Sequence, residues 1–139
     1  MYNILLVEDE RETAESVKEA FELEGIMADV AYNGREGLAK FHENDYDLIL
    51  LDLKMPLMTG EELLKVIRSE NPYIEIIVYT NFTEYGDIKK LINLGINGYV
   101  NKGAEAELDE LIDIVKSKLE PLGVENTQRL LQSTVEIRG

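Results

Sequence analysis

Five polar residues stand at the ends of short apolar segments, where their side chains could do chemistry together: Glu8, Asp9, Asp52, Thr80 and Lys102. If the segments are parallel strands of one sheet, their carboxyl ends share an edge and these side chains converge there. Three carboxylates packed together would raise one another's pKa values unless a cation lies among them. Mg²⁺ prefers oxygen ligands of this kind, so the pattern predicts a magnesium site.

The same side chains suit the transfer of a phosphoryl group. A carboxylate beside a divalent cation and a lysine can attack phosphorus and form an aspartyl phosphate. Lys102 could neutralise a phosphoryl oxygen, and Thr80 could donate a hydrogen bond to another. Each residue alone has an ordinary structural explanation, such as a helix-terminal acid or a surface lysine. Their shared edge favours a functional site.

The elements that must position these residues follow from the hydrophobic pattern. Apolar segments at 3–7, 27–32, 47–52, 74–79 and 97–101 predict five strands. Helical patterns follow at 10–24, 34–44, 60–69, 84–94 and 105–119, with Leu91, Ile92 and Leu94 on one side of the fourth helix. Thr59 and Glu62 form a capping pattern before the third helix. This alternation predicts an α/β fold, a flavodoxin-like doubly wound five-stranded parallel sheet of order 2-1-3-4-5 with helices on both faces.

Length and composition limit the class of protein. The 139 residues include 14 Lys and Arg against 28 Asp and Glu, a net charge of −14, and 45% are hydrophobic. Such a chain is neither a disordered acidic tail nor suited to bind nucleic acid or an anionic membrane. It has no cysteine and no apolar run long enough to span a bilayer. We expect a cytoplasmic domain over residues 1–120, with 121–139 an extension or linker too short for a second domain.

Four segments together resemble the receiver domains of two-component response regulators. They read ILLVED (4–9), LLDLKMPLMTG (50–60), VYT (78–80) and GYVNK (98–102), and the resemblance covers about residues 1–119. It implies phosphorelay signalling, in which Asp52 accepts a phosphoryl group from a sensor histidine kinase or a histidine phosphotransfer protein. It also implies a phosphoacceptor that phosphorylates and dephosphorylates only itself, rather than an enzyme with turnover.

The resemblance also implies a set of metal ligands. Asp9 and Asp52 would bind Mg²⁺ directly, with the backbone carbonyl of Lys54 as a third protein ligand. Glu8 would act through a metal-bound water. The family usually has aspartate at the position of Glu8, and the additional methylene should change the outer-shell geometry more than it affects binding itself.

The switch that the resemblance implies involves three further side chains. Thr80 and Lys102 would bind the phosphoryl oxygens, and Tyr99 would change rotamer as Thr80 shifts. The change would favour one of two states in the face built from the fourth helix, fifth strand and fifth helix, which would contact a downstream protein target. The family usually has proline where Gly103 stands and a small residue where Asn81 stands, which bears on loop geometry and phosphate lifetime.

Other functions remain open at this point. An aspartate-nucleophile phosphohydrolase needs an acid/base aspartate two residues after the nucleophile, where Lys54 stands. No glycine-rich nucleotide loop follows the first strand. A receiver-like binding module that is never phosphorylated is the main alternative. The chain is too short for a DNA-binding effector domain, so we expect a stand-alone or excised receiver that is monomeric when unphosphorylated.

Overall fold

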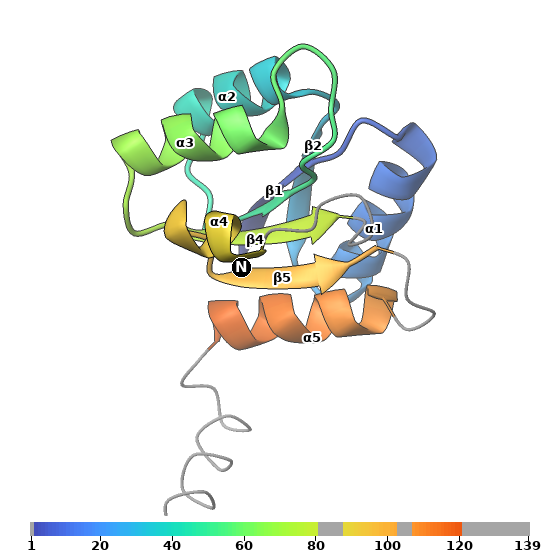
Figure 1. Ribbon diagram of the computed structural model, residues 1–139. Coiled ribbons are helices and arrows are strands. Elements are labelled where there is room, and N and C mark those ends of the chain that lie inside the picture. Colours follow the sequence, from blue (N-terminus) through green and yellow to red (C-terminus); the bar gives the residue numbers. More distant parts are fainter. Residues whose placement is uncertain (1, 81–87, 103–106, 121–139) are drawn as a thin grey trace, which may run out of the picture.

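The computed structural model describes residues 2–80, 88–102 and 107–120 as five strands that alternate with five helices (Figure 1). The strands are β1 (Asn3–Val7), β2 (Met27–Ala31), β3 (Leu48–Leu51), β4 (Glu75–Thr80) and β5 (Gly98–Asn101). The helices are α1 (Arg11–Leu23), α2 (Gly34–Glu43), α3 (Gly60–Glu70), α4 (Ile88–Asn93) and α5 (Glu107–Leu119). All strand pairs are parallel, and the order β2-β1-β3-β4-β5 confirms the predicted doubly wound sheet.

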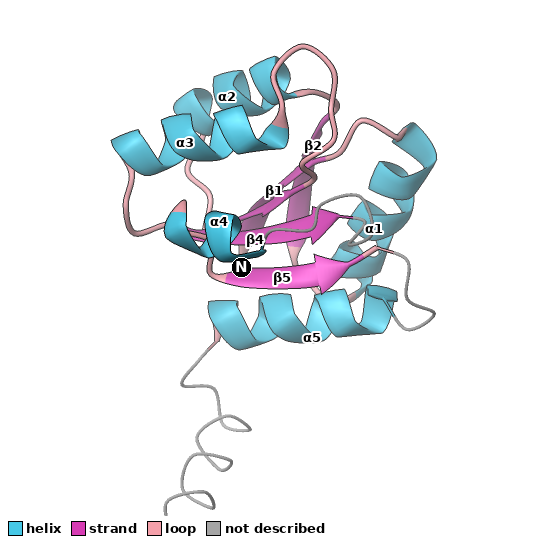
Figure 2. Ribbon diagram, viewed as in Figure 1, coloured by secondary structure: helices cyan, strands magenta, loops and turns pink. Residues whose placement is uncertain are grey.

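Helices cover both faces of the sheet, as Figure 2 shows. Alternate residues of a strand point to opposite faces, and β1 illustrates the consequence. Ile4 and Leu6 belong to a core with α1 and α5, whereas Leu5 and Val7 belong to a core with α2 and α3. The inner strand β3 is buried at every position, as its continuous apolar pattern predicts.

The strand register aligns the ends of the four strands that precede the polar residues. Val7 pairs with Leu51, and Leu51 pairs with Val78. Thr80 pairs with Asn101, the residue before Lys102. The carboxyl ends of β1, β3, β4 and β5 therefore lie along one edge, at the right of Figure 1 for β4 and β5.

The elements differ from the sequence-based expectation in small ways. Most described strand ends shift by one residue, and the positions 84–87 and 105–106 of two predicted helices lie outside the described residues. The prediction that Leu91 and Ile92 share one side of α4 is wrong, because Leu91 is buried and Ile92 is 58% exposed. Successive residues of a helix lie about 100° apart, so only one of the two can face the sheet.

Helix α3 begins as its capping pattern predicts. The Thr59 side chain accepts a hydrogen bond of 3.2 Å from the backbone N–H of Glu62. Within residues 2–80, 88–102 and 107–120, no helix has both the length and the apolar character needed to cross a membrane. The proposed extension, 121–139, lies outside the described residues.

Candidate functional site

Asp52 occupies the end of the central strand β3 and is almost fully buried, with 4% of its surface exposed. Its backbone N–H donates a hydrogen bond of 3.0 Å to the carbonyl of Val7, which extends the pairing of β1 and β3 by one residue. The backbone N–H of Lys54 donates to Asp52 Oδ1 at 3.3 Å. The main chain thus fixes this carboxylate at the edge where the strands end.

The loop after Asp52 returns tightly against it at Gly60. The Gly60 N–H donates to the Leu53 carbonyl at 3.0 Å. A Cβ atom at Gly60 would overlap the carbonyl oxygen of Asp52 and lie 2.5 Å from Leu53 Cα. Only glycine therefore permits this approach of the α3 start to the carboxylate-bearing residue.

Three carboxylates form a cluster at this edge. Glu8, Asp9 and Asp52 each offer one oxygen, and these oxygens lie within 4.8 Å of one another. Glu8 and Asp52 are buried, whereas Asp9 is exposed. Within the described part of the chain, the buried Glu8 Oε2 has no hydrogen-bond partner. Hard oxygen donors with one unsatisfied buried oxygen fit the binding of a small divalent cation such as Mg²⁺.

Lys102 supplies the positive charge of the site. Its Nζ donates hydrogen bonds to Glu8 Oε1 and, at 3.2 Å, to Asp52 Oδ2, and it lies 5.5 Å from the centre of the Tyr79 ring. Its backbone N–H donates to the Thr80 carbonyl at 2.9 Å, so the end of β4 positions it. Burial lowers the pKa of Lys102, but the contacts with the two carboxylates outweigh burial, and the pKa is raised.

The electrostatics of Glu8 differ from those of an ordinary surface carboxylate. Burial, and next the contact with Asp52, raise the pKa of Glu8 to about 8, although Lys102 opposes both effects. A group with such a pKa is partly protonated near neutral pH when no cation is bound. The sequence places Glu8 in the site but does not predict its complete burial or its contact with Lys102.

Thr80 and Tyr99 lie on the neighbouring strands β4 and β5. Thr80 is 3% exposed at the last position of β4. Tyr99 pairs with Val78 in the β4–β5 register and packs with Leu91 of α4, and burial raises its pKa. Their arrangement brings Thr80 to the predicted edge and packs Tyr99 against the small core that includes Leu91 of α4.

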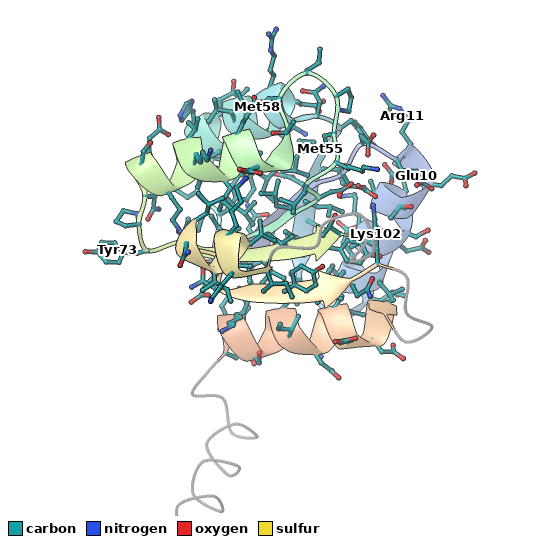
Figure 3. All side chains as sticks on the ribbon, viewed as in Figure 1. Glu10, Arg11, Met55, Met58, Tyr73 and Lys102 are labelled. Atoms are coloured by element: carbon teal, nitrogen blue, oxygen red, sulfur yellow. The ribbon has the colours of Figure 1, made fainter. Side chains whose placement is uncertain are left out.

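A contact between the start of α1 and the residue after β2 is not predicted by the sequence. The guanidinium carbon of Arg11 lies 4.0 Å from the centre of the Tyr32 ring, and the Tyr32 hydroxyl donates to Glu15 Oε1 at 2.7 Å. Figure 3 labels Arg11 and Lys102, which lie at the same end of the molecule. Arg11 and Tyr32 are far apart in the sequence, so no periodic pattern indicates their contact.

Three further residues that the sequence makes notable do not belong to the described site. His42 is on α2, half-exposed, and its Nε2 lies 2.7 Å from Glu70 Oε2, away from the carboxylate cluster. Asn81 and Gly103, two positions at which the sequence departs from the family pattern, lie outside the described residues.

The sequence and the fold both match known proteins. The sequence pattern of the response regulator receiver domain matches residues 4–116. The chain is 32% identical over 121 residues to the uncharacterized transcriptional regulatory protein YkoG of Bacillus subtilis, covering 87% of this chain and 52% of that protein. It is 34% identical over 119 residues to the response regulator ArlR of Staphylococcus saprophyticus, covering 86% and 53%. The chain thus spans about half the length of these curated relatives.

Solved structures show the same fold. The response regulator TrrA of Thermotoga maritima, solved in complex with Mg²⁺ and BeF, is 37% identical with a TM-score of 0.77, covering 86% of this chain and 100% of that one. A CheY-like receiver domain protein from Methanospirillum hungatei is 30% identical with a TM-score of 0.77, covering 87% and 95%.

Proposed function

The chain belongs to the response regulator receiver family, whose members act in two-component phosphorelay signalling, and from this premise we propose that Asp52 accepts a phosphoryl group in a Mg²⁺-dependent reaction. A carboxylate oxygen of Asp52 forms a bond to phosphorus while the P–N bond of a donor phosphohistidine breaks. The imidazole leaves with the electron pair of that bond. The donor would be a sensor histidine kinase or a histidine phosphotransfer protein.

Four residues would hold the cation. Asp9 and Asp52 would bind Mg²⁺ directly, together with the backbone carbonyl of Lys54, and Glu8 would act through a bound water. When bound, Mg²⁺ would neutralise the charge on the phosphoryl oxygens while the carboxylate attacks phosphorus. The likeness to TrrA, a relative solved with Mg²⁺ and BeF, and the cluster of carboxylate oxygens support this assignment.

Lys102 and Thr80 would bind the transferred group. Lys102 Nζ already contacts Asp52, so a small movement would bring it to a phosphoryl oxygen. The buried hydroxyl of Thr80 would donate to a second oxygen. Tyr99, packed against α4, would follow the Thr80 movement and change the face formed by α4, β5 and α5.

One observation carries the proposal: a buried aspartate at the central strand end lies 3.2 Å from a lysine and within a three-carboxylate cluster. The output would be contact with a downstream protein target rather than with nucleic acid or membrane, in keeping with the net charge of −14. We expect the unphosphorylated domain to be monomeric, which sedimentation with and without beryllium fluoride would test.

The direct test compares Asp52→Asn with the wild-type chain. With Mg²⁺ and acetyl phosphate, we expect the wild type to gain the mass of one phosphoryl group and Asp52→Asn to gain none. Asp45→Asn removes the same charge from an exposed residue and should react as the wild type does. Omission of Mg²⁺ should abolish the mass gain in every variant.

The same experiment addresses the alternative function. A folded wild-type chain that gains no phosphoryl group and shows no Mg²⁺-dependent amide shifts with beryllium fluoride would contradict the proposal. That outcome would favour a phosphorylation-independent binding module. Equal labelling of Asp52→Asn and the wild type would instead place the acceptor elsewhere.

A further inference from the structure

We propose that Arg11, held against the Tyr32 ring, draws anionic phosphodonors to the acidic edge that bears Asp52. This inference rests on the function proposed above, because it concerns the approach of the donor to the same acceptor. It assigns a positioning role to a residue pair that joins the start of α1 to the end of β2. Neither residue is one of the proposed metal ligands or phosphoryl-binding side chains.

The contact with Tyr32 fixes the guanidinium at the end of the molecule that carries the site. Arg11 is the first residue of α1 and stands two positions after Asp9, while Tyr32 directly follows β2. The Arg11 guanidinium carbon is 4.0 Å from the ring centre, a distance at which a cation is attracted to an aromatic face. Figure 3 shows Arg11, Glu10 and Lys102 at one end of the molecule.

Two hydrogen bonds hold Tyr32, one at its hydroxyl and one at its backbone. The Tyr32 hydroxyl donates to Glu15 Oε1 at 2.7 Å, and its backbone N–H donates to Glu36 Oε2 at 3.3 Å. An exposed arginine normally samples many rotamers, but this contact favours one position of the charge. The side chain of Arg11 stays exposed, so the outer edge of its guanidinium remains accessible to an anion.

A positive charge at this position is otherwise unfavourable for the helix. The first turn of a helix favours negative charge, and α1 begins with a cation. The residues on either side, Asp9, Glu10 and Glu12, are exposed acids. A phosphodonor is an anion and is repelled by such an edge and by a net charge of −14. Arg11 places one positive charge among these acids and so weakens the repulsion that an approaching donor meets.

The first measurement is the phosphorylation rate with acetyl phosphate at saturating Mg²⁺ and low ionic strength. In this reaction the bond from Asp52 to phosphorus forms as the P–O bond to acetate breaks, and acetate leaves with the electron pair. We expect Arg11→Gln to lower the rate about two- to fourfold at subsaturating donor, from the interaction of one charge with a dianion across about 10 Å of water. The difference should disappear at about 1 M salt, where screening acts over about 3 Å.

Further variants separate charge from structure. Arg11→Lys keeps the charge and should restore most of the rate. Tyr32→Phe keeps the ring and should react nearly as the wild type, whereas Tyr32→Leu releases the guanidinium and should resemble Arg11→Gln. Lys89→Gln removes an exposed cation from α4 and serves as the control without effect.

The second measurement is Mg²⁺ affinity from amide NMR shifts without any donor. Loss of a nearby cation should tighten Mg²⁺ binding in Arg11→Gln and lower its phosphorylation rate. A damaged site would instead weaken Mg²⁺ binding and lower the rate. An unchanged rate in Arg11→Gln, or weaker Mg²⁺ binding together with a slower rate, would overturn the inference. If the wild type itself gains no phosphoryl group at Asp52, the proposed function fails and this inference fails with it.

Discussion

At the residue scale, Glu8 carries one methylene group more than the aspartate that the family usually has at this position. Its carboxylate is fully buried and accepts a hydrogen bond from Lys102, which also donates to Asp52. The free energy needed to bury a charge is offset only in part by one lysine shared between two acids. The raised pKa of Glu8, about 8, follows from that imbalance.

We predict that Glu8→Gln changes the pH dependence of stability in the metal-free protein. Because the pKa of Glu8 rises from an ordinary 4.5 to about 8 on folding, its ionisation destabilises the native state progressively between these values. Glutamine stays neutral, so the melting temperature of Glu8→Gln relative to the wild type should increase from about pH 5 to about pH 9, by about 3 °C or more. Thermal unfolding in the presence of EDTA would measure it.

Two controls make this prediction specific. Glu12→Gln neutralises an exposed carboxylate on α1 and should show no comparable change with pH. Mg²⁺ should reduce the difference for Glu8→Gln, because a cation favours the ionised form of Glu8. A relative melting temperature of Glu8→Gln that stays constant or falls as the pH rises would contradict the assigned pKa.

The sequence predicts which residues form the cluster because strand ends are visible in it. Asp52, Thr80 and Lys102 each follow an apolar segment, and parallel pairing is enough to bring them to one edge. Burial and partner choice are not visible in the same way. Lys102 contacts Glu8 across 94 residues, a choice decided by side-chain length and by the path of β5.

At the scale of elements, the loop from β3 to α3 depends on one glycine. We predict that Gly60→Ala lowers the free energy of unfolding by about 3 kcal/mol, because backbone atoms of Asp52 and Leu53 block the new Cβ and cannot move as a side chain can. The variant should also weaken Mg²⁺ binding, since Asp52 would be displaced. Urea unfolding and amide NMR shifts would measure the two effects.

Gly37→Ala is the matched control in α2. The three atoms nearest to its Cβ would be side-chain methyl groups of Val7 and Leu63, at 3.1 to 3.2 Å. Alanine also favours a helix more than glycine does, by about 1 kcal/mol. We therefore expect a change below about 1 kcal/mol and unaltered Mg²⁺ binding. An equal decrease in the free energy of unfolding of the two variants would contradict the proposed steric effect of the backbone at Gly60.

The hydrophobic pattern predicts the strands better than it predicts the exposed helix positions and the contacts between elements. The strands agree with the prediction because β3 and its neighbours are buried on both faces and read as apolar segments. The prediction that Ile92 lies on the same side of α4 as Leu91 is wrong because an apolar residue on a short, partly exposed helix is not required to face the core. The contact of Arg11 with Tyr32 joins two elements, and neither element's pattern contains it.

At the scale of the whole molecule, the net acidic charge belongs to residues 1–120 rather than to residues 121–139. Residues 121–139 contain two glutamates and two arginines, so the net charge of −14 resides on residues 1–120. Residues 1–120 therefore carry the charge that repels nucleic acid and attracts cations.

We predict that a chain ending at Glu120 folds and binds Mg²⁺ like the full chain. The two large core clusters join residues from Tyr2 to Leu119, and α5 packs on the sheet with its last turn tied to α1 by the Lys116–Glu24 ion pair at 2.7 Å. The melting temperatures should agree within about 2 °C, since the apolar burial that stabilises the sheet is retained. Phosphorylation by acetyl phosphate should also be unchanged.

A shorter truncation serves as the control. A chain ending at Leu111 removes Val115 from the core and should not fold, which shows that the melting experiment detects the loss of core residues. A large drop in melting temperature on removal of 121–139 alone would instead make the extension part of the folded unit and move the domain boundary beyond residue 120.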